Sequence, residues 1–178
     1  PGEYDYEYDQ VVSNGEIWST IIIAEFLKKS GLYLVWTDIR KSLVTDDRFR
    51  DANIIWDESH KRINKVFDFT LHKFYLTQGF IGATVSGAST TLGREGSDYT
   101  AAILANMLDA ESVTVWKDVP GLLNADPKWL HDVEKLEEVS YREAVEMTFS
   151  GAKVIHPKTI KPLQNKNIPL FVKSFINP

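Results

Sequence analysis

The turn at residues 91–98 carries the densest group of residues that could bind an anion. Gly93 and Gly96 allow the backbone to bring several N–H groups close to a ligand. Ser97 is expected to cap a following helix, whose amide end carries about half a positive charge. Arg94 adds a planar guanidinium that can hold a carboxylate through two hydrogen bonds. The same pattern also fits an ordinary capped turn between a strand and a helix, so both interpretations stay open.

A second candidate segment is residues 116–128, which leaves a strand through a Val-Pro-Gly turn and then passes an Asp-Pro turn. Lys117 and Asp118 at the strand end could contact a ribose or phosphates, and Lys128 could reach a phosphate. Gly121 suits the position of a type II turn that needs a positive φ. The alternative is two ordinary turns with solvated charges.

A third candidate segment is residues 150–157. Lys153 could offset charge on a transferring phosphoryl group, or it could complement the carboxyl end of a helix dipole. His156 is expected to start the next helix rather than to perform acid–base chemistry.

Glu16 has two interpretations as well. With Ser13 it forms a capping-box pattern at a helix start, and its carboxylate could equally pair with the ammonium group of an amino acid. The histidines are scattered without ligand spacing, so no protein-built metal site is expected. Any Mg²⁺ would arrive with a nucleotide and be held mainly by its phosphates.

Hydrophobic periodicity predicts helices alternating with strands. Such an order implies right-handed crossovers and one α/β domain over residues 1–178, with a mainly parallel sheet covered on both faces. Ligands of such sheets bind beyond the carboxyl ends of the strands, where the three candidate segments are expected. The predicted helices are 13–29, stopped at Gly31, and 57–67, 98–108, 141–149 and 158–164; the predicted strands are 32–36, 73–81, 112–116 and 169–173.

Composition excludes several classes of protein. The net charge of −5 gives no support for nonspecific binding to nucleic acid. No apolar run approaches the roughly 20 residues of a membrane span, and residues 1–9 lack the features of a signal peptide. The absence of cysteine excludes disulfides and thiolate sites and fits a cytoplasmic protein.

Seven short motifs, in this order, resemble aspartokinase of the amino-acid kinase family, and the likeness runs from about residue 11 to the C-terminus. They are Val-Ser-Asn-Gly-Glu (12–16), Thr-Gln-Gly-Phe-Ile-Gly (77–82), Thr-Thr-Leu-Gly-Arg (90–94), Gly-Ser-Asp-Tyr-Thr (96–100), Trp-Lys-Asp-Val-Pro-Gly (116–121), Asp-Pro (126–127) and Phe-Ser-Gly-Ala-Lys-Val-Ile-His-Pro (149–157).

The resemblance implies a three-layer α/β/α sandwich of the carbamate kinase-like type. It also implies transfer of the ATP γ-phosphoryl group to the β-carboxylate of L-aspartate, the first step towards lysine, threonine and methionine, by a homo-oligomer. Glu16, Arg94 and Ser97 would bind aspartate, and Asp98 would orient the catalytic lysine and the transferring group. The ATP pocket would be formed by Lys117, Asp118, Leu123, Lys128, Lys153 and Val154.

The chain also departs from the family pattern. Residues 1–178 contain no Lys-Phe-Gly-Gly segment, which supplies the family's catalytic lysine, and the resemblance places the family's regulatory ACT domains beyond this stretch. We therefore expect an N-terminally truncated part of one catalytic domain. Glu95 stands where a glycine is frequent, and Leu123 where an aromatic residue is common.

Two other classes of function fit parts of the pattern. Another amino-acid kinase, acting on glutamate, acetylglutamate or a nucleotide, would share the fold, and an acceptor screen would separate it. A noncatalytic module that binds a nucleotide or an amino acid would fit the missing lysine segment. A dinucleotide oxidoreductase is a distant third, because neither G-x-G-x-x-G nor the P-loop pattern is present.

We predict that a polypeptide of residues 1–178 by itself catalyses no aspartate-dependent release of ADP, because the positive charge of the family's catalytic lysine is missing. A coupled assay for ADP tests this. Normal turnover with aspartate would contradict the prediction.

Overall fold

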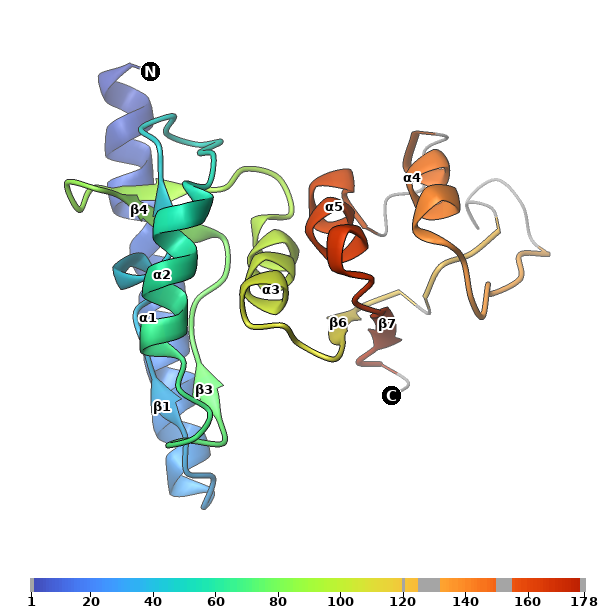
Figure 1. Cartoon of the computed structure of the whole chain (residues 1–178), viewed down its shortest axis with the longest axis horizontal. Coiled ribbons are helices and arrows are strands. Elements are labelled where there is room, and N and C mark those ends of the chain that lie inside the picture. The colour runs from blue at the N-terminus through green and yellow to red at the C-terminus, as the bar shows by residue number, and fades with distance from the viewer. Residues whose placement is uncertain (1, 120, 125–131, 150–154, 177–178) are drawn as a thin grey trace. The chain divides into compact units, whose positions relative to one another are not determined.

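The computed structural model describes residues 2–119, 121–124, 132–149 and 155–176 (Figure 1). It comprises two compact units, residues 1–100 and 101–178, each described here by itself. In chain order the elements are α1 (Glu3–Lys29), β1 (Val35–Trp36), the 3-10 helix η1 (Ile39–Lys41), β2 (Val44–Thr45), α2 (Trp56–Val66), β3 (Tyr75–Leu76), β4 (Ile81–Thr84), β5 (Ser89–Thr91), α3 (Gly96–Met107), β6 (Val113–Lys117), α4 (Tyr141–Phe149), α5 (Pro157–Lys166) and β7 (Leu170–Ser174).

Helix α1 begins at Glu3, so the predicted start at Ser13 and the capping box with Glu16 are wrong. Ser13 lies buried inside the helix, where its hydroxyl donates to the Gln10 carbonyl oxygen at 3.3 Å. Acidic residues in the first turn complement the helix dipole, and tertiary contacts of the next two turns keep this segment helical. Local capping signals could not reveal those contacts.

Two opposite faces of α1 differ in an unusual way. The buried face is mostly small or polar, whereas large apolar side chains, namely Trp18, Ile22 and Phe26, are exposed on the other side. A helix normally buries its apolar stripe, so hydrophobic periodicity would predict the wrong buried face for α1. The buried residues are Asp9, Ser13, Ile17, Thr20 and Ala24.

The predicted strand at 73–81 is wrong as one element, since it is split into β3 and the start of β4 by residues 77–80. Phe80 adopts a φ of 70°, which a continuous strand does not allow. Side-chain hydrogen bonding of Gln78 and packing of Gly79 hold this break, as described below. The predicted strand at 32–36 is likewise shortened to β1.

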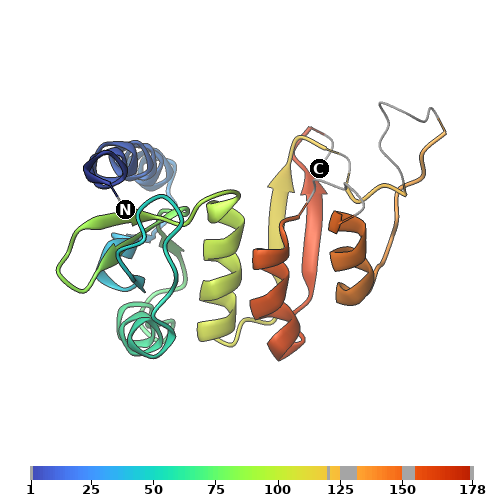
Figure 2. The same ribbon diagram turned by 90° about the horizontal axis from the view of Figure 1, so that it is seen from above.

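In the first unit, α1 and α2 lie on opposite faces of the short strands (Figure 2). Strand β1 pairs parallel with β3, and β2 pairs parallel with β4, with Val44 opposite Ala83. Strand β5, which the sequence analysis missed, returns antiparallel to β4 through a turn in which Gly87 has a φ of 92°. The parallel pairings confirm the predicted α/β class, and the hairpin delivers the chain to the 91–98 turn.

The second unit follows the prediction closely. Strands β6 and β7 pair in parallel, and helices α4 and α5 contact each other. His156 starts α5 by accepting a hydrogen bond at Nδ1 from the Lys158 N–H at 3.2 Å, which confirms its expected role. The buried core comprises Ala102, Ala105, Val113, Val115, Ile155, Ile160, Leu163 and Ile168.

Two predicted glycine positions are also confirmed. Gly31 ends α1 with a φ of 90°, and Gly121 has a φ of 138° in the turn after β6. No helix within the described ranges is long and apolar enough to cross a membrane.

Asp9 joins α1 to β5 and to the loop before α2. Its fully buried carboxylate accepts hydrogen bonds at 2.8 Å from the Thr91 N–H, the Thr91 hydroxyl and the Arg50 N–H. Charge-assisted bonds of this kind are stronger than neutral ones, and their loss leaves buried donors without partners.

We predict that Asp9→Asn lowers the free energy of unfolding by about 3 kcal/mol, because an amide nitrogen would face N–H and O–H donors. Asp5→Asn is the matched control, since Asp5 makes only a partly exposed ion pair with Arg50 at 3.3 Å. Urea denaturation of both variants measures the difference. An equal effect of the two substitutions would contradict the prediction.

Candidate functional site

The connection between β3 and β4 packs directly on the first turn of α3. A Cβ atom at Gly79 would lie 2.8 Å from the Ser97 Cα, so only glycine permits this approach. The Phe80 N–H donates to the Thr100 hydroxyl at 3.0 Å, and the Phe80 carbonyl oxygen accepts from the Leu92 N–H at 2.9 Å. The motifs at 77–82 and 90–100 therefore form one structure.

The turn at 93–98 has the shape that its glycines predict, but Ser97 does not cap the helix. Helix α3 begins at Gly96, so Ser97 is its second residue and is exposed. Gly93 has a φ of 75°, and a Cβ at Gly96 would lie 2.7 Å from the Phe80 ring. The predicted cap is wrong because the chain already turns at Gly93, whose carbonyl oxygen accepts from the Gly96 N–H at 3.2 Å.

Several charged groups surround this turn. Arg94 is exposed and makes no ion pair with any residue that the structure describes. Asp98 is half-buried in the first turn of α3. Asp51, which the sequence analysis missed, lies so close that a Cβ at Gly93 would stand 2.6 Å from its Oδ1. Burial, and then the charge of Asp51, raise the pKa of Tyr99.

Glu95 combines two unfavourable features. It adopts a φ of 53°, which costs free energy for a residue with a Cβ. Its Oε2 is buried and has no hydrogen-bond partner within residues 2–119, 121–124, 132–149 and 155–176. The negative charge that the sequence places beside Arg94 is therefore held in the turn itself.

Glu16 lies half-buried in the middle of α1, where burial raises the pKa of its carboxyl group. The Thr20 hydroxyl donates to the Glu16 carbonyl oxygen at 2.9 Å and accepts from Gln78 Nε2 at 2.8 Å. Gln78 precedes Gly79, which contacts Ser97. The structure thus links the turn of α1 that carries Glu16 to the start of α3.

Three of the residues predicted for the ATP pocket belong to the second unit. Lys117 is the half-buried last residue of β6, and its carbonyl oxygen accepts from the Phe175 N–H at 3.0 Å. Asp118 is exposed, and Leu123 is half-buried and bridges to Lys135. Their roles stay predictions. Lys128, Lys153 and Val154 lie outside the described residues.

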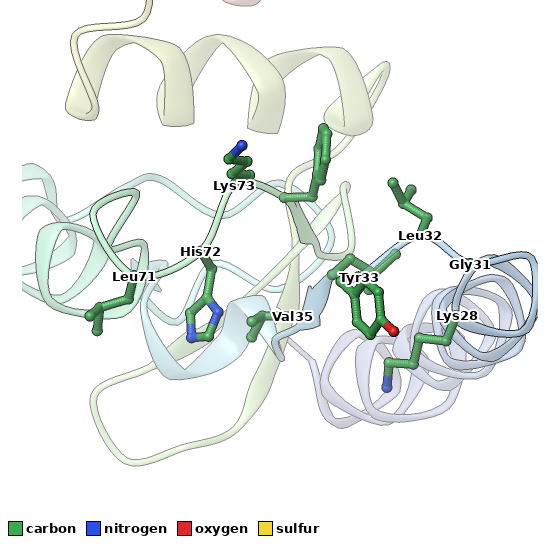
Figure 3. Close-up of a pocket in the computed structure, with 10 residues that line it drawn as sticks. Lys28, Gly31, Leu32, Tyr33, Val35, Leu71, His72 and Lys73 are labelled. Atoms are coloured by element: carbon green, nitrogen blue, oxygen red, sulfur yellow. The ribbon is translucent and has the colours of Figure 1, made fainter.

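Two hollows of the first unit lie away from the predicted site residues Glu16, Arg94 and Ser97. One, of about 610 Å³, lies at the end of α1 and includes Lys28, Tyr33, His72 and Lys73 (Figure 3). Tyr33 is 93% exposed, so this is a shallow, open surface. A second, of about 660 Å³, includes Thr45 and Ser86. Neither contains a predicted site residue.

Among the described residues, no group of three or more His, Asp or Glu side chains is arranged to hold a metal ion.

The family model of the amino acid kinase family matches residues 3–174. This chain belongs to the amino acid kinase family. It is 40% identical over 171 residues to lysine-sensitive aspartokinase 3 of Escherichia coli K12, covering 96% of this chain and 38% of that protein. It is 38% identical to bifunctional aspartokinase/homoserine dehydrogenase 2 of Arabidopsis thaliana, covering 95% of this chain and 19% of that protein.

Among solved structures, E. coli aspartokinase III in complex with aspartate and ADP superposes with a TM-score of 0.90 at 40% identity, covering 96% of this chain and 38% of that chain. The likeness confirms the predicted amino-acid kinase fold. The chain spans well under half the length of these relatives.

We predict that Glu95→Gly stabilises the protein by about 1 kcal/mol, because it relieves the positive φ and removes the buried oxygen. Glu95→Ala is the matched control, since it removes the oxygen but keeps the backbone conformation unfavourable. Thermal and urea denaturation measure both variants. Destabilisation by Glu95→Gly would show that the carboxylate has a stabilising partner.

Proposed function

We propose that the complete protein to which this chain belongs transfers the γ-phosphoryl group of ATP to the β-carboxylate of L-aspartate. The observation that carries the proposal is the match to E. coli aspartokinase III, whose structure holds aspartate and ADP, at 40% identity over 96% of this chain.

Glu16, Arg94 and Ser97 form the aspartate-binding group of this proposal. The Glu16 carboxylate pairs with the substrate ammonium group, and the exposed guanidinium of Arg94 holds a carboxylate through two parallel hydrogen bonds. Ser97 adds a hydroxyl at the start of α3, where the helix dipole favours negative charge. Support comes from the rigid contact between Gly79 and Ser97, which fixes this end of the site.

The transfer itself needs positioning and charge neutralisation. An oxygen of the β-carboxylate attacks the γ-phosphorus, and the bond to the β–γ bridging oxygen breaks, so that ADP leaves with the electron pair and no proton moves. Asp98 orients the catalytic lysine of the family's Lys-Phe-Gly-Gly segment, which neutralises charge on the phosphoryl oxygens. Mg²⁺ bound with ATP would supply further charge neutralisation on the phosphates.

ATP is held, in this proposal, by the loops that follow β6 and α4. Lys117 and Asp118 contact the ribose and phosphates, and Leu123 lies against the base. Lys128 and Lys153 contact phosphate oxygens, and the backbone at Val154 completes the pocket. We further propose that residues 1–178 are part of one catalytic domain of a cytoplasmic homo-oligomer.

We predict that Arg94→Lys raises the KM for aspartate by about 10-fold or more, because lysine cannot form the two parallel hydrogen bonds. The KM for ATP stays unchanged. Arg62→Lys, at an exposed pair with Glu58, is the control. The assay uses the complete protein and traps the acyl phosphate with hydroxylamine, comparing aspartate, glutamate and acetylglutamate as acceptors. Equal turnover of glutamate would contradict the choice of substrate.

We predict a pH dependence set by Glu16. Burial raises the pKa of this carboxyl group above its ordinary value of 4.5, and only the ionised form pairs with an ammonium group. The value of kcat/KM for aspartate therefore falls, as pH decreases, at a higher pH than an ordinary glutamate would give. Glu16→Gln should lower kcat/KM at neutral pH and abolish this limb of the pH profile. A limb that persists in Glu16→Gln would exclude Glu16 as its origin.

A further inference from the structure

Gln78 is a fully buried amide that connects three separate parts of the first unit. It is 1% exposed. Its Oε1 accepts from the Ile39 N–H at 2.9 Å, and its Nε2 donates to the Thr20 hydroxyl oxygen at 2.8 Å. A flipped amide would place an NH₂ group against the Ile39 N–H, so these two partners fix the orientation of the side chain.

The Thr20 hydroxyl is fully used by its neighbours. Its oxygen accepts from Gln78 Nε2 and, at 3.1 Å, from the Trp36 indole N–H. Its Oγ1 lies 2.9 Å from the Glu16 carbonyl oxygen and 3.0 Å from that of Ile17, so these two oxygens compete for its single proton. Gln78 is therefore tied to the helical turn that begins with Glu16.

The residues on either side of Gln78, Thr77 and Gly79, also make contacts that hold residues 77–79 in place. Thr77 donates its hydroxyl hydrogen to the Thr37 carbonyl oxygen at 2.9 Å. Gly79 approaches Ser97 so closely that a Cβ would stand 2.8 Å from its Cα. Residues 77–79 thus form a short brace, with Glu16's turn of α1 on one side and the first turn of α3 on the other.

We propose that Gln78 is a positioning residue that sets the separation between Glu16 and the Arg94–Asp98 turn. This inference rests on the proposed aspartate site. Gln78 acts through Thr20 and Gly79 and does not touch the substrate. A shift of α1 relative to α3 would separate the group that binds ammonium from the groups that bind carboxylate, and misplacement by about 1 Å costs up to about 100-fold in rate.

The test uses the complete protein with Gln78→Met, which keeps an unbranched side chain of similar length but removes both hydrogen bonds. We expect kcat/KM for aspartate to fall between about 10- and 100-fold per folded molecule, with the KM for ATP unchanged. Trp36→Phe is the matched control, because it removes the other donor to Thr20 and leaves the link to Gln78. It should lower stability without changing the KM for aspartate.

A double-mutant cycle separates positioning from general stability. Thr20→Val breaks the same link from the helix side, so its effect on kcat/KM should not add to that of Gln78→Met. Thr20→Ser keeps the hydroxyl group and should therefore keep the kcat/KM of the unmodified protein. Gln78→Met with lowered stability but normal kinetics would overturn the proposal, as would failure of both Gln78→Met and Thr20→Val to fold. Absence of aspartate turnover in the unmodified protein would instead overturn the proposed function.

Discussion

The first unit depends on one close backbone contact, that of Gly79 with Ser97. It requires the chain to leave β3, turn through a positive φ at Phe80 and enter β4, rather than continue as one strand. The hydrogen bonds of Phe80 with Thr100 and Leu92 then hold the start of α3 against this turn. A side chain at position 79 would separate the β3–β4 connection from the first turn of α3, which carries the candidate residues Ser97 and Asp98.

Helix α1 contributes to the same arrangement through polar groups that a hydrophobic pattern does not reveal. Asp9 holds β5 and the loop at Arg50, Gln10 bonds both the N–H and the carbonyl oxygen of Ser89, and Thr20 meets Gln78. Asp9, Gln10 and Thr20 each have hydrogen-bond partners, so this interface favours one orientation of the helix, whereas an apolar contact would allow several. Precise orientation matters here because Glu16 lies on this helix.

The charges around the 91–98 turn suggest how a mildly acidic protein can handle anionic ligands. Arg94 is exposed, while Asp51, Glu95 and Asp98 lie in or beside the turn. In the proposed phosphoryl-transfer site, these carboxylates would raise the need for cations supplied by lysines and by the ion that accompanies ATP. Of these three residues, Glu95 is the one with a positive φ, and this backbone conformation works against stability together with the burial of its Oε2.

Much of the fold and part of the site could be predicted from the sequence. The α/β class, the elements after residue 95 and the glycine positions at 31 and 121 follow from local periodicity and backbone preference, which neighbouring residues decide. The motif at 77–82 is visible in the sequence, but the contacts of Gln78 and Gly79 are not, because their partners lie about 20 to 60 positions away along the chain.

The sequence by itself determined the residue types that can bind an amino acid and a phosphate, and their order along the chain. Only the tertiary structure decided that the helix carrying Ser13 and Glu16 begins at Glu3, that residues 73–81 break into two strands and that Ser97 follows the start of α3. The physical reason is common to all three. Buried hydrogen bonds and a contact permitted only by glycine join distant segments, and these outweigh the local capping and strand preferences of the same residues.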